Sequence, residues 1–210
     1  MEVKGITYLG FRSVLDSLDE HIGVNGKNAI LRYVGMENFI ATPPDYDSDK
    51  RLDDSQYKRF WSGIREIVGN KGYSALIYRA GIMTVNTALT HSEGLKALVN
   101  LDAGPVEKIH QAYGAYLYNT GLDPTKLMEI DEDKQEIVIH RPNCNECENI
   151  YKNEQLTRDI NKPGCAFVRG AFYQLGNLRP DLFVVDTVRE TKCKLLGDDE
   201  CLFVIKYEIT

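Results

Sequence analysis

The sequence has no excess of positive charge. Its 210 residues include 25 Lys and Arg against 31 Asp and Glu, which gives a net charge of −6 at pH 7. Nucleic-acid binding needs clustered Lys and Arg to neutralise phosphates, and the sequence contains no basic run of useful length. We therefore expect no direct contact with DNA or RNA.

Long hydrophobic runs are also missing. The longest apolar stretch, residues 74–89, is interrupted by Arg79 and Asn86, so it is shorter and more polar than a membrane-spanning helix requires. The first residues lack the apolar core and small-residue cleavage site of a secretory signal. We expect a cytoplasmic protein without a transmembrane segment. A partner at the membrane surface or within a membrane protein stays open.

A glycine-rich phosphate loop is absent from every place where a strand would meet a helix. Nucleotide chemistry with the known fingerprints is therefore excluded, and reduction of a substrate would need some other cofactor. A binding protein is favoured over an enzyme. The five cysteines favour metal, ligand or redox use over structural disulfides, because a cytoplasmic compartment is reducing.

The order of the elements is helices first and strands last. Apolar residues recur at three- and four-residue intervals over residues 8–22, 57–68, 106–117 and 167–175, which predicts helices with one buried face. Residues 126–141, around an acidic turn, and 182–209, around Gly197, predict two β-hairpins. We therefore expect an α+β fold, with an antiparallel sheet of two hairpins covered on one face by helices.

The N-terminal part has a different composition from the rest. Residues 36–55 contain Pro43, Pro44 and several aspartates, which predict a long exposed loop. We expect residues 1–55 to form N-terminal helices and an acidic loop packed on a main domain of residues 56–210.

One side of the helix expected near residues 73–91 carries small residues, which let another backbone approach closely. These residues could pack against a neighbouring helix, admit a ligand or form a dimer contact; they are Ala80, Gly81, Thr84 and Ala88.

The last two strands bring thiols together. In a hairpin centred on Gly197, Cys193 and Cys201 face each other, and tetrahedral zinc requires sulfurs about 3.5–4 Å apart. Strict alternation places Glu190 on the opposite face from Cys193, so a β-bulge must intervene for both to bind one ion. Cys165 would complete the set if the last helix crosses the hairpin. A cross-strand disulfide, or two small buried side chains, remains an alternative.

Cys144 and Cys147 form a separate Cys-x-x-Cys pair in a loop. The pair could be a second metal half-site, a redox pair or a covalent attachment point for a bilin-like chromophore. Two ordinary loop cysteines are an equal alternative, because no helix start is at hand to activate a thiolate.

Several short runs resemble a known family, the 4-vinyl reductase domain proteins, also called predicted hydrocarbon-binding proteins. The runs are Gly164-Cys165-Ala166-Phe167, Gly170-Ala171-Phe172-Tyr173, Glu190-Thr191-Lys192-Cys193 and Cys201-Leu202-Phe203. The same domain is the sensor part of phenol-responsive activators, and its fold is similar to that of haem-based nitric-oxide sensors and of small transport-particle subunits. The resemblance is specific over residues 163–208 and looser over about 57–141.

The resemblance implies a structural zinc and a ligand cavity. The zinc ligands would be Cys165, Glu190, Cys193 and Cys201, and four protein ligands leave no open position for a substrate. The cavity would lie between helices and sheet, where His110, Tyr113, Tyr116, Phe172 and Tyr173 occupy the corresponding elements. His110 could bind a phenolic oxygen or a tetrapyrrole metal. The alternative is that His110 is an ordinary partly buried histidine and that the four aromatic residues are core side chains.

The function implied is that of a small binding protein. It would hold a hydrophobic or tetrapyrrole-type ligand, such as a chlorophyll precursor or a bilin, and act as an accessory or assembly factor in pigment-protein biogenesis for photosynthesis, as a homodimer. The first alternative is an enzyme or enzyme subunit that reduces a vinyl group of a chlorophyll precursor. The second is a dimeric scaffold whose cavity is filled by side chains.

Overall fold

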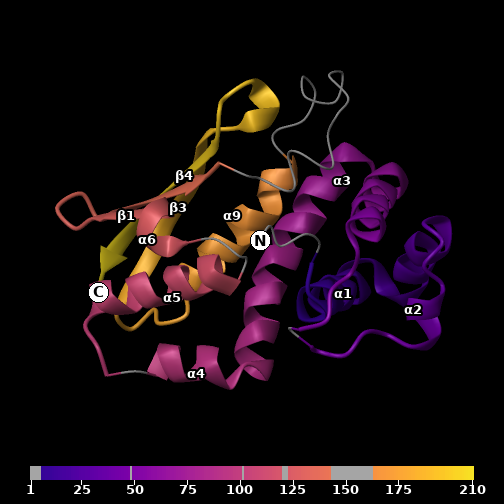
Figure 1. Ribbon diagram of the computed structural model, residues 1–210, viewed down its shortest axis with the longest axis horizontal. Coiled ribbons are helices and arrows are strands. Elements are labelled where there is room, and N and C mark those ends of the chain that lie inside the picture. The colour runs from indigo at the N-terminus through magenta and orange to yellow at the C-terminus, as the bar shows by residue number, and fades with distance from the viewer. Residues whose placement is uncertain (1–5, 48, 101, 120–122, 143–162) are drawn as a thin grey trace.

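The computed structural model describes residues 6–47, 49–100, 102–119, 123–142 and 163–210. Within these ranges, helices make up most of the residues, and four strands come late in the sequence (Figure 1). The elements are α1 (Tyr8–Tyr33), α2 (Asn38–Ala41), α3 (Asp54–His91), α4 (Glu93–Asn100), α5 (Pro105–Asn119), α6 (Pro124–Leu127), β1 (Met128–Asp131), β2 (Glu136–Arg141), α9 (Pro163–Gly176), β3 (Phe183–Lys192), a 3₁₀ turn η1 (Lys194–Leu196) and β4 (Cys201–Ile209).

Two glycines interrupt the long helices. Gly23 in α1 and Gly69 in α3 have nearly the same backbone angles, φ 73° and ψ 165° against φ 71° and ψ 166°. Only glycine adopts this region without strain. The helix expected over residues 8–22 ends at the break at Gly23 inside α1. The two helices expected near residues 57–68 and 73–91 are the two halves of α3.

The four strands form one antiparallel sheet in the order β1-β2-β4-β3. Each expected hairpin is therefore present, and the two hairpins join through β2 and β4. In Figure 1, α5 and α9 lie beside the sheet, α3 follows, and α1 and α2 lie beyond α3. The expected α+β fold, with helices on one face of the sheet, is confirmed.

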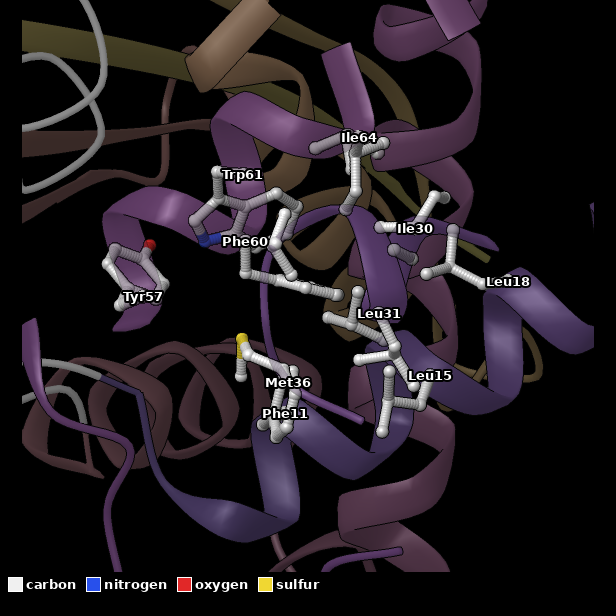
Figure 2. Packing of buried hydrophobic residues seen from close by; sticks show 14 of the residues in the cluster. Phe11, Leu15, Leu18, Ile30, Leu31, Met36, Tyr57, Phe60, Trp61 and Ile64 are labelled. Carbon is white, nitrogen blue, oxygen red and sulfur yellow. The ribbon is translucent and has the colours of Figure 1, made fainter. Parts of the chain in front are cut away.

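The hydrophobic core has two parts that divide within α3. One cluster contains the buried side chains of α1, α2 and the first part of α3, together with Phe167 of α9 (Figure 2). The other lies between α5, α9 and the sheet and begins at Val85. The core packing thus divides between Ala80 and Val85, and the domain boundary expected near residue 55 stays a prediction.

Helices α3 and α9 cross at two glycines. A Cβ atom added to Gly81 would lie 2.1 Å from the carbonyl oxygen of Phe167, and one added to Gly170 would lie 2.0 Å from that of Tyr78. The small-residue side of α3 therefore packs against α9, as one of its expected roles. Thr84 and Ala88 on this side stay partly exposed, and the dimer contact suggested for the side stays a prediction.

The acidic loop expected over residues 36–55 contains α2 and is fastened to the start of α1. The backbone amides of Tyr8 and Leu9 donate to the carbonyls of Lys50 and Asp47, both at 2.8 Å, and the amide of Leu52 donates to Ile6 at 2.9 Å. Within the described ranges, no helix has both the length and the apolar character needed to cross a membrane.

Candidate functional site

A cluster of metal-binding side chains lies at the closed end of the β3–β4 hairpin. The ligand atoms of Glu190, Cys193 and Cys201 all lie within 4.8 Å of one another. Both cysteines are fully buried, while Glu190 is partly exposed. We call these three residues the hairpin cluster.

The turn of the hairpin sets the two cysteines opposite each other. Lys192 pairs with Leu202, so the next positions outward along the turn are Cys193 and Cys201. Gly197 closes the turn with φ 96°, and the Asp198 carboxylate accepts a 2.6 Å hydrogen bond from the Cys193 amide. The facing of the two thiols, expected from their spacing around Gly197, follows from this register.

An irregularity in β3 brings Glu190 to the same place. Glu190 pairs with Phe203 and Lys192 pairs with Leu202, so the register shifts between these two residues of β3. Thr191 is the extra residue. A shift of this kind places Glu190 and Cys193 on one side of the strand, which regular alternation would prevent. The bulge required by the sequence argument is therefore present.

The cluster suits a thiophilic divalent ion. Zinc with ligands at about 2.0–2.3 Å brings neighbouring ligand atoms to about 3.5–4 Å, so ligand atoms that all lie within 4.8 Å of one another need to approach by no more than about 1 Å. Cys165 lies in the first turn of α9, a helix that packs against β3, but its side chain is not among the described groups. Cys144 and Cys147 lie outside the described residues.

Positive charge borders the hairpin cluster, and the sequence alone gave no sign of it. Arg141 pairs with Cys201 across β2 and β4, and its side chain is buried on the same face. On the other face, His140 Nδ1 donates to Glu200 at 3.0 Å, and this hydrogen bond is the main reason that the pKa of Glu200 lies below its ordinary value. A buried cation next to thiolates favours their charged form.

Three of the five expected cavity residues meet between α5 and α9. The ring of Phe172 lies 5.7 Å from that of Tyr113 and 5.4 Å from that of Tyr116. Phe203 of β4 completes the group at 5.3 Å from Phe172. The Tyr113 hydroxyl donates to the Phe172 carbonyl at 2.6 Å, and burial raises the pKa of Tyr113. We call these four residues the α5–α9 aromatic cluster.

The other two expected cavity residues lie apart from this cluster. His110 on α5 is exposed, and Tyr173 on α9 is 37% exposed. Phe203 was missed by the sequence argument, although its inward position on β4 follows from the alternation that starts at Cys201. The described rings of the α5–α9 aromatic cluster fill the space that a ligand would need.

Comparison with solved structures finds the same fold in H-NOX proteins. An H-NOX protein from S. oneidensis in the Fe(II)NO state matches with a TM-score of 0.63 and 12% identity, over 98% of this chain and 99% of that one. An oxygen-binding H-NOX domain related to soluble guanylate cyclases matches with a TM-score of 0.56 and 13% identity, over 94% and 92%. Because the identities are low, the likeness establishes the fold alone, and the expected haem-NO-sensor fold is confirmed.

No protein-family model matches the chain, and no curated protein matches it. The resemblance to 4-vinyl reductase domains therefore remains a prediction from the motifs quoted above.

Proposed function

We propose that this chain is a binding module for an apolar small molecule, built on the H-NOX-type fold and fastened by a structural zinc. The observation that carries the proposal is the hairpin cluster, in which Glu190, Cys193 and Cys201 come within 4.8 Å. Such a meeting requires both a turn of fixed register and a bulge, and the chain has both.

In this proposal the fourth zinc ligand is Cys165. The three sulfurs and one carboxylate carry four negative charges against the two positive charges of zinc, so a net charge of −2 would be buried. Arg141, buried beside Cys201, would offset part of it. Zinc with four protein ligands is structural, and here it would tie the start of α9 to the last hairpin.

The ligand class is supported by the fold and limited by the packing. The similar solved proteins include an Fe(II)NO complex, an oxygen complex and one described in terms of its haem redox potential, which supports a tetrapyrrole-type ligand. The closed α5–α9 aromatic cluster does not fit a macrocycle, and His110 is exposed. A ligand of that size therefore requires α5 to separate from α9, and we assign no chemical step to it.

The wider role in this proposal is non-enzymatic. The module would carry or protect its ligand as an accessory or assembly factor in pigment-protein biogenesis. Homodimers are part of the proposal, and their contact would lie away from Gly81, which packs against α9.

Elemental analysis of the purified chain tests the zinc. We expect about one zinc per chain, lost in Cys193→Ser together with thermal stability, because the binding energy of a structural metal is also folding energy. Cys144→Ser is the matched control, as it removes a thiol that the proposal does not use. Zinc-free wild-type protein with full stability, or equal zinc loss in both variants, would contradict the proposed ligand set.

Absorbance spectroscopy tests the ligand. We expect a visible band that stays with the protein through gel filtration, either as purified or after addition of hemin. Turnover of a vinyl-bearing chlorophyll precursor with added reductant would instead favour the enzyme. If neither result is obtained, the scaffold whose cavity is filled by side chains remains.

A further inference from the structure

Trp61 is the only tryptophan of the chain, and its side chain carries an unmet hydrogen-bond donor. The residue is 2% exposed, and its indole nitrogen Nε1 is buried with no hydrogen-bond partner among the described residues. Buried indole N–H groups usually find an acceptor. This donor therefore calls for an acceptor that the described part of the chain does not supply.

The donor is enclosed by aromatic rings. Their centroids lie between 5.7 and 6.4 Å from that of Trp61, in edge-to-face contacts, and they belong to Tyr57, Phe60, Tyr73 and Phe167. In Figure 2 the indole nitrogen is turned toward the side on which Tyr57 lies. An aromatic enclosure around an unmet indole donor suits a flat, ring-containing molecule that has an acceptor oxygen.

The walls of this enclosure come from three segments. Trp61 lies in α3 before the break at Gly69, Tyr73 lies after it, and Phe167 belongs to α9. An atom added at the Cβ position of Gly69 would meet nothing within 4 Å. To admit a small guest, the two halves of α3 would have to tilt about this glycine, where the helix is already interrupted.

The α5–α9 aromatic cluster differs because its buried hydroxyl group already has a hydrogen-bond partner. The Tyr113 hydroxyl donates to the Phe172 carbonyl, so this cluster is complete as a core. The geometry points to Trp61 as the anchor of a ligand subsite for a small aryl ketone, whose oxygen accepts from the indole N–H. This inference rests on the proposed binding function and gives it a place in the N-terminal half.

Two isosteric probes test the subsite on the full chain. Acetophenone has a ketone oxygen, and α-methylstyrene has a CH₂ group in its place. The single indole signal in a ¹H–¹⁵N spectrum reports the site directly, because there is only one tryptophan. We expect acetophenone to move the indole proton downfield and to bind about five- to tenfold more tightly than α-methylstyrene, as one hydrogen bond to a buried donor provides.

Trp61→Phe keeps an aromatic ring and removes the donor. Ligand-observed NMR should show that this variant binds the two probes equally, with the affinity for α-methylstyrene unchanged. Tyr113→Phe, which removes a buried hydroxyl from the other aromatic cluster, is the matched control and should keep the preference for the ketone.

Three outcomes would overturn the inference: equal binding of the two probes by the wild-type chain, an indole signal that does not move at saturating acetophenone, or a ketone preference that survives in Trp61→Phe. If the indole N–H donates only to a buried water, the indole signal would not move at saturating acetophenone. The two-probe comparison on the unmodified chain remains decisive if the variant does not fold. If the chain binds pigment but shows no preference for the ketone, only this inference is contradicted. If the chain prefers the ketone but holds neither zinc nor pigment, only the proposed function is contradicted.

Discussion

At the scale of single residues, the pair Arg179 and Asp181 gives a pH prediction with a definite sign. Two hydrogen bonds from the guanidinium, at 2.8 and 2.6 Å, lower the pKa of Asp181 from 3.8 to about 2. A pKa lower in the folded state means that this stabilisation is complete above about pH 4 and is lost as the pH falls toward 2. Asp181→Asn should therefore lower the urea midpoint at pH 6 and have little effect near pH 2.

The control for this prediction is Asp186→Asn, which changes an exposed carboxylate on β3. The effect of Asp186→Asn on the urea midpoint should not decrease between pH 6 and pH 2 as that of Asp181→Asn does. Comparing variants at each pH cancels any loss of metal in acid. A constant difference between wild type and Asp181→Asn from pH 6 to pH 2 would show that the ion pair does not control the stability.

The residues of the hairpin cluster were predictable to different degrees. Cys193 and Cys201 follow from local geometry, because their positions are symmetric about Gly197. Glu190 joins the cluster only through a β-bulge. The sequence showed that a bulge was needed, but its presence depends on how β3 pairs with β4. Arg141 could not be found, because the pairing of β2 with β4 joins residues 60 positions apart and no local pattern encodes it.

At the scale of elements, the break in α3 predicts opposite effects for two neighbouring glycines. Gly69→Ala should cost about 1–3 kcal/mol, because its backbone angles are open only to glycine. Gly72→Ala should be neutral or stabilise by up to about 1 kcal/mol, because an added Cβ would meet only ordinary contacts with Val68. Urea unfolding of both variants measures the difference. Equal effects would mean that α3 is continuous at Gly69.

The crossing of α3 and α9 predicts a larger effect. A Cβ atom on Gly81 would overlap the Phe167 carbonyl, which is backbone and cannot rotate away, so Gly81→Ala should cost at least about 3 kcal/mol. Gly104→Ala is the control, since an added Cβ there would meet nothing within 4 Å. Thermal unfolding compares the two, and a shift in Gly81→Ala no larger than in the control would contradict the close crossing.

Periodicity predicted the long helices and both hairpins, because a buried face leaves a repeating apolar pattern. It missed α4 and α6, which are short. It also suggested the small-residue side of α3 without identifying its partner. The partner is α9, whose own glycine lies about 90 positions further along the chain, and only the folded structure joins the two.

At the scale of the whole molecule, α9 connects the two hydrophobic clusters and the candidate metal site. It gives Phe167 to the N-terminal cluster and Phe172 to the cluster near the sheet, and Cys165 lies two residues before Phe167. Removing the proposed zinc should therefore loosen the start of α9 and change the surroundings of Trp61, whose ring lies 5.9 Å from that of Phe167.

Tryptophan emission during chelation measures this coupling. With 1,10-phenanthroline, we expect the Trp61 emission to shift to longer wavelength together with a lower melting temperature, because a looser enclosure admits water. Cys193→Ser should show the shifted emission without chelator, whereas Cys144→Ser should respond to chelator as the wild type does. If chelation lowers the melting temperature while the emission stays unchanged, then the metal stabilises only the half of the molecule that contains the sheet, and α9 does not transmit its loss to the N-terminal cluster.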